Sequence, residues 1–117
     1  MINYHKDLIA ALNKILPSYY EMTLHSGIKT PCISYMETNN YSDTEVLGAT
    51  IGYSRLTYQV KVWGHNISEL QEYAAAIDKE LRALGWKRTS SGELYDKQST
   101  MIQKIMQFEA LAQEQFN

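Results

Sequence analysis

The stretch Tyr53-Ser-Arg-Leu-Thr-Tyr-Gln-Val-Lys-Val-Trp63 decides the fold. Its apolar residues stand at every second position, at Leu56, Tyr58, Val60 and Val62, and polar residues separate them. Side chains of a β-strand point alternately to opposite faces of the sheet. The stretch therefore predicts a long strand with one face in a core and the other in water.

The period changes directly after this strand, at Gly64-His65-Asn66. Two overlapping capping boxes follow, Asn66 with Glu69 and Ser68 with Gln71, and such pairs satisfy the free amides at a helix start. An apolar stripe at helical spacing then predicts a helix from Ser68 to Leu84. The stripe consists of Leu70, Tyr73, Ala74, Ile77, Leu81 and Leu84. Gly85 is expected as a left-handed C-cap, with Trp86 packing back onto the helix.

A second helix is expected near the N-terminus, from His5 to Leu16. Leu8, Leu12 and Ile15 share one of its faces, and Pro17 ends it because proline cannot continue the hydrogen-bond ladder. A short extended piece should follow, from Tyr19 to Leu24. A strand opened by Pro31 and rich in β-branched and aromatic residues should then run to Glu37.

The last third of the chain is less regular. Residues 87–91 and 93–96 flank Gly92 and are interpreted as a hairpin or as a strand with a broken edge, and Ser90-Ser91-Gly92 could equally be an unstructured bend. Residues 101–111 fit a strand or a helix, and a strand is preferred because two helices on one long strand need more sheet to cover them. The fold class is therefore α+β: a mainly antiparallel twisted sheet of about four strands with two helices, His5 to Leu16 and Ser68 to Leu84, packed on it.

Composition limits the classes of function. The 117 residues, 44% hydrophobic and 21% charged, are typical of one globular domain, 1–117. A net charge of −2 argues against binding nucleic acid by neutralising phosphates. Cys32 is the single cysteine and has no partner for an internal disulfide. No signal peptide or membrane-spanning run is apparent, so folding in a reducing cytoplasm is expected.

Motifs for catalysis and metal binding are not apparent. His5, His25 and His65 are dispersed, without a His or Cys at ligand spacing. Cys32 lies within the expected strand, where a small buried hydrophobe is the ordinary interpretation. No enzyme activity, cofactor or metal is therefore expected.

Residues 38–52 are mostly polar or small and are expected to form a long mobile loop, while residues 112–117 should fray. Apolar residues in such a loop indicate a contact surface that orders on assembly, although single exposed aromatics are also normal in proteins without a partner. The candidate interface residues, from this loop and from the wet face of the long strand, are Tyr41, Val46, Leu47, Ile51, Tyr53, Arg55 and Trp63.

Three short sequence segments, and the order in which they occur, resemble those of a known protein family. They are Thr30-Pro-Cys-Ile-Ser-Tyr35 after the first helix, Tyr58-Gln-Val-Lys-Val-Trp-Gly64 directly before the second helix, and Lys104-Ile-Met-Gln-Phe-Glu109 at the end. From Asp7 to about Ala110 the chain resembles the tail-completion proteins of long-tailed bacteriophages and prophages, also called tail terminators or tail-to-head joining proteins.

The resemblance implies a structural virion protein at the tail-head interface, assembled in the cytoplasm of the bacterial host. It implies a homo-oligomeric ring, commonly a hexamer, that caps the tail tube, ends tail polymerisation and offers a docking surface to the head connector. The implied partners are tail tube protein and a head-completion or connector protein, without sequence-specific nucleic acid or membrane. Another phage neck or head-completion protein, or a small non-viral ligand-binding module, remains an alternative.

Overall fold

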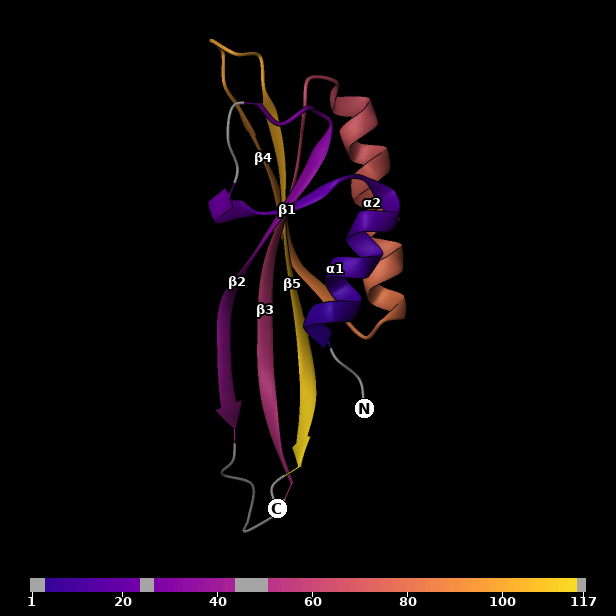
Figure 1. Ribbon diagram of the computed structural model, residues 1–117, viewed down its shortest axis with the longest axis vertical. Helices are drawn as coiled ribbons and strands as arrows, with labels where there is room; N and C mark the ends of the chain where they lie inside the picture. The colour runs from indigo at the N-terminus through magenta and orange to yellow at the C-terminus, as the bar shows by residue number, and fades with distance from the viewer. Residues whose placement is uncertain (1–3, 24–26, 44–50, 116–117) are drawn as a thin grey trace.

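The computed structural model describes residues 4–23, 27–43 and 51–115 (Figure 1). It has α+β content, with two α-helices and one five-stranded sheet. Its elements in chain order are α1 (Tyr4–Ile15), β1 (Ser18–Tyr20), the 3-10 helix η1 (Glu21–Thr23), β2 (Cys32–Asp43), β3 (Ile51–Gly64), α2 (Ile67–Ala83), β4 (Lys87–Tyr95) and β5 (Ile102–Gln115).

The strand order in the sheet is β1-β2-β3-β5-β4. The β1 and β2 strands are parallel, whereas the other three neighbouring pairs are antiparallel. The expectation of a mainly antiparallel sheet of about four strands is thus correct in outline, and the structure adds a fifth strand that is parallel to its neighbour. The parallel strand is β1, and its three residues are too few to show any hydrophobic period.

Both helices lie on the same face of the sheet (Figure 1). The alternation predicted for β3 is confirmed, because Leu56, Tyr58, Val60 and Val62 are all buried. Leu70, Ile77 and Leu81 of α2, Leu8 and Leu12 of α1, and Met106 and Phe108 of β5 complete the centre of the core between the helices and the sheet. Among the described residues the other face of the sheet has no α-helix over it, and we call it the open face.

The predicted ends of α2 are confirmed to within one residue. Asn66 is the N-cap, and its side-chain oxygen accepts a hydrogen bond from the Glu69 amide at 3.2 Å. The first capping box therefore operates, while Ser68 lies inside the helix. Gly85 has a φ of 98°, in the left-handed region that glycine tolerates best, and the Trp86 amide returns to the Leu81 carbonyl at 2.9 Å.

The strands are longer than the sequence indicated. Residues 38–43 and 51–52, expected in a mobile loop, belong to β2 and β3. Residues 112–115, expected to fray, belong to β5. The cause is pairing: β3 has 14 residues and is bonded on both sides to β2 and β5 along most of its length, which recruits neighbours of low strand propensity.

The structure of the last two strands decides between the alternatives that the sequence left open for residues 87–96 and 101–111. Residues 102–111 form part of a strand, as preferred, and Met106, Phe108 and Ala110 are its buried face. Residues 87–95 form one continuous strand, β4, with Gly92 inside it and a register shift between Arg88 and Ser90. All nine residues of β4 are exposed, since the strand forms one edge of the sheet.

Candidate interaction surface

The sheet extends beyond the helices as three strands without a helical cover (Figure 1). We call this extension the blade and define it as residues 41–43 of β2, 51–55 of β3 and 111–115 of β5. Neither β1 nor β4 reaches it, because β1 pairs only up to Tyr35 and β4 only up to Glu109. The blade makes the molecule elongated, with extents of 55 × 23 × 23 Å.

The strand register brings most of the predicted interface residues to the blade. Tyr41 is directly opposite Arg55, which in turn is opposite Leu111. Tyr53 lies two positions before Arg55 on β3, and Ile51 is the first residue of that strand. Val46 and Leu47 lie outside the described residues.

Arg55 and Leu111 are the blade residues whose side chains are described, and both are exposed. Leu111 has 54% of its surface accessible. The Arg55 guanidinium lies 3.5 Å from a Glu109 carboxylate oxygen, on the neighbouring strand. An apolar side chain beside a half-exposed ion pair is a combination often found where two proteins meet.

Trp63 lies apart from the other predicted residues, at the opposite end of β3. Its indole N–H donates to the buried Ser34 hydroxyl at 2.8 Å, and the Lys61 ammonium lies 5.6 Å from its ring centroid. Lys61 is paired with Glu21 of η1 at 2.8 Å. The Lys61–Glu21 pair fastens η1 to the open face, and the indole N–H of Trp63 is satisfied within the sheet, where it joins β3 to β2.

A second polar cluster, which sequence reasoning missed, joins α1 to the sheet. The His5 Nδ1 atom is in hydrogen-bond contact with the Tyr58 hydroxyl and lies 3.1 Å from a Glu37 carboxylate oxygen. Burial raises the pKa of Tyr58, and the charge of Glu37 raises it further. Tyr58 is thus held as a neutral hydroxyl. The three residues are 53 positions apart at most in sequence, and only the packing of α1 on β2 and β3 brings them together.

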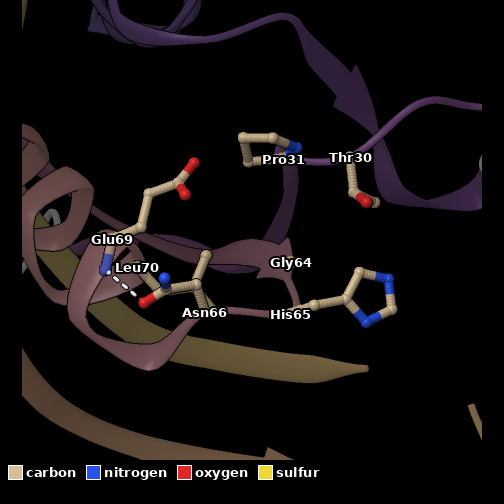
Figure 2. A pocket seen from close by; sticks show the side chains of 7 residues that line it. All are labelled: Thr30, Pro31, Gly64, His65, Asn66, Glu69 and Leu70. Atoms are coloured by element: carbon tan, nitrogen blue, oxygen red, sulfur yellow. Dashed lines mark hydrogen bonds between the residues drawn. The ribbon is translucent and has the colours of Figure 1, made fainter. Parts of the chain in front are cut away.

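A shallow pocket of about 210 Å³ lies where β3 turns into α2 (Figure 2). It is lined by Thr30, Pro31, Gly64, His65, Asn66, Glu69 and Leu70. The side chains of Glu69 and His65 lie on opposite sides of it (Figure 2). His65 is engaged through Nδ1 with the backbone oxygen of Thr100 at 3.0 Å. The pocket is smaller than the roughly 300–1,000 Å³ usual for small-molecule sites.

Cys32 is buried, as predicted, and burial raises the pKa of its thiol. Among residues 4–23, 27–43 and 51–115, no three His, Cys, Asp or Glu side chains gather in a way that could hold a metal ion. The helices described also include none with the length and apolar character needed to cross a membrane.

No model of a protein family matches the chain. No curated protein matches it either.

Proposed function

We propose that this chain is a structural virion protein of a long-tailed bacteriophage or prophage. Copies form a ring, with six as the expected number, on the last ring of tail tube subunits. The ring ends tube polymerisation and offers its other face to the head connector. In this role the protein acts in the virion, at the junction of tail and head, and is assembled in the bacterial cytoplasm without catalysing a reaction.

The observation that carries the proposal is the blade. Three strands project past the helical layer with both edges unpaired among the described residues. Unpaired strand edges are templates for pairing with another chain, and monomeric proteins usually shorten or cover them. A subunit whose working partners are other protein surfaces has a use for such a projection, and the blade also collects Tyr41, Ile51, Tyr53 and Arg55.

A ring that terminates a polymer must bind the tube on one face and must not offer the tube's own surface on the other. The two ends of this molecule differ in the way that this requires. The blade forms one end, while the turn of residues 96–101 between β4 and β5 forms the other (Figure 1). We assign the tube or connector contacts to these two ends and the contacts within the ring to the sides.

The test uses the purified chain and the tail tube protein encoded by the same phage or prophage. Sedimentation and electron microscopy should show rings, and adding the chain to growing tubes should stop their elongation. The variant Leu111→Asp should keep its circular dichroism spectrum and lose tube capping, because it places a charge on the exposed face of the blade. Ala75→Glu, at an exposed position of α2, is the matched control and should cap normally. Monomers at every concentration together with unaffected tube growth would contradict the proposal.

A further inference from the structure

The sheet has two unpaired edges that lie on opposite sides of the molecule. One is β4, the last strand in the order, whose residues 87–95 are all exposed. The other belongs to β2, because β1 covers only Ile33, Ser34 and Tyr35 of that strand. Residues 36–43 of β2 therefore have no strand beside them on their outer side within the described part of the chain. The two free edges are nine and eight residues long.

The two edges run in opposite directions. The pairs β2 with β3, β3 with β5 and β5 with β4 are all antiparallel, so β4 is antiparallel to β2. A second copy placed beside the first in the same orientation would therefore present its β2 edge antiparallel to the β4 edge. No rotation of either copy within the sheet is needed to make the ladder.

Side-chain chemistry also matches along the two edges. Antiparallel pairing brings the start of β4 to the end of the free part of β2, so Lys87 comes opposite Asp43 and, seven residues along each strand, Leu94 comes opposite Met36. Leu94 pairs with Gln103 and Met36 with Gln59, which puts both residues on the open face. The edge contact thus includes an apolar pair, Met36 with Leu94, and cross-strand pairs of apolar side chains stabilise sheets.

The edges are displaced along the strand direction. Measured along β5, β4 covers residues 102–109, whereas the free part of β2 lies level with residues 107–113 through its pairing with β3. The pairing of Lys87 with Asp43 displaces the edges by four residues, because Lys87 is level with Glu109 of β5 and Asp43 is level with Gln113, and four residues span about 14 Å at the usual rise per residue. From β2 of one copy to β2 of the next is a step of four strands, β2, β3, β5 and β4, or about 19 Å across the sheet. For each such step the neighbouring copy must move along the strands by this displacement.

This displacement is the one that closes a sheet. A shift of about 14 Å along the strands for every 19 Å across the sheet corresponds to strands tilted by about 36° from the axis of a closed ring, within the 35–45° typical of β-barrels. This tilt angle does not depend on the number of copies in the ring, because each copy adds the same shift along the strands and the same width across the sheet. An unshifted neighbour would instead face β4 with the three residues of β1 and leave the β2 edge of the blade unpaired.

We propose that copies of this chain join by pairing β4 of one copy with residues 36–43 of β2 in the next. The five-stranded sheets then continue from copy to copy around a closed ring. The helices lie on the outside of this ring and the open face lines its channel, because the two helices make that face of the subunit the bulkier one. The inference rests on the proposed function only in requiring that the chain form a closed ring.

Disulfide trapping tests the pairing. The double variant Met36→Cys with Leu94→Cys is made in a Cys32→Ala background and oxidised with diamide. Within one copy the two positions are separated by β3 and β5, about 14 Å across the sheet, which is too far for a disulfide. Non-reducing electrophoresis should show a ladder of covalent oligomers that ends at the size of the ring.

The matched control is Leu94→Cys with Thr57→Cys, whose second position lies on the same face but on the central strand β3. Its cross-linked yield should be at least about tenfold lower, because an edge strand cannot bring its Cβ within bonding distance of β3. Circular dichroism establishes that each variant is folded, and sedimentation gives its oligomeric state before oxidation.

The outcomes separate the two proposals. Rings that form but give no ladder would overturn the edge pairing and leave the proposed function standing. A covalent dimer from Leu94→Cys alone, as its only product, would mean that β4 pairs with β4 about a two-fold axis and would also overturn the inference. Monomers throughout would contradict both proposals.

Discussion

The phenol ring of Tyr58 stands edge-on to the indole of Trp86, with the ring centroids 5.5 Å apart and the planes at 88°. Tyr4 of α1 meets the same indole from another side, at 5.9 Å and 78°. Trp86 directly follows Gly85 at the end of α2, so this one side chain contacts α1 and the centre of the sheet at the point where the chain leaves α2. Such edge-to-face pairs add to the energy of burial itself.

Trp86 should therefore be among the most sensitive positions in the chain. We expect Trp86→Ala to lower the free energy of unfolding by about 3–5 kcal/mol, through lost burial and a cavity. Trp86→Phe should lower it by less than half as much, because it retains a ring and removes an indole N–H that is buried without a partner. Urea unfolding followed by circular dichroism measures both, and equal losses would show that the ring contacts contribute little.

Tyr58 should make stability depend on pH in the alkaline range. Its pKa is raised in the folded chain above the value of about 10 expected in the unfolded chain. The stabilisation is therefore complete below about pH 10 and is lost as the pH rises beyond it, because the unfolded chain releases the proton first. Tyr58→Phe should show a smaller loss of stability on going to alkaline pH than the parent chain. Tyr95→Phe, at a position 58% exposed, is the control and should leave the alkaline loss unchanged.

Substitution by alanine should have different effects on stability at Gly85 and at Gly92. Gly85 has a φ of 98°, and a non-glycine residue in a left-handed conformation costs about 1–2 kcal/mol, so Gly85→Ala should destabilise by roughly that amount. A Cβ at Gly92 would meet no atom within 4 Å, and Gly92→Ala should be neutral or slightly stabilising. Thermal unfolding of the two variants side by side provides the comparison, and an equal loss for both would contradict the assignment of the C-cap.

The start of α2 should depend on Asn66 and not on Ser68. Asn66→Ala should cost about 1 kcal/mol, because the Glu69 amide loses its acceptor. Asn66→Asp should retain the stability of the parent chain, since the carboxylate also accepts and lies at the positive end of the helix dipole. Ser68→Ala is the control for the second capping box and should change stability by less than about 0.5 kcal/mol.

The core face of α2 should be sensitive to truncation. Ile77 and Leu81 are fully buried, so changing either to Ala should cost about 2–5 kcal/mol. Glu80→Ala, at an exposed position beside Leu81, should be nearly neutral. Unchanged denaturant midpoints for both core variants would show that the helix packs through another face.

The elements that sequence alone predicts well are those in which local pattern and tertiary role agree. The alternation in β3 and the capped, amphipathic α2 are of this kind, and their buried residues are the ones expected. Where tertiary pairing overrides local preference, prediction fails. Asn39, Asn40, Ser42 and Asp43 have little strand propensity, yet each is paired with a β3 residue in one continuous ladder.

The candidate surface shows the same division. Period-two alternation correctly assigned Arg55 and Trp63 to one face of the long strand, but it carries no information about position along the sheet. Register supplies that information: it places Tyr41 opposite Arg55 and leaves Trp63 at the far end, bonded to Ser34. The His5, Glu37 and Tyr58 cluster has no local signature, since its members come from three elements.

The blade lies outside the region that holds the fold together, because the core cluster ends with Leu56 on β3 and Ala110 on β5. Substitutions in residues 51–55 and 111–115 therefore leave the contacts between the helices and the core face of the sheet unchanged. Selection on folding and selection on partner recognition then act on different residues of the same strands. Among descendants of this chain, residues 56–64 of β3, under the helices, should diverge slowly. Residues 51–55 can change with each new partner surface that they contact.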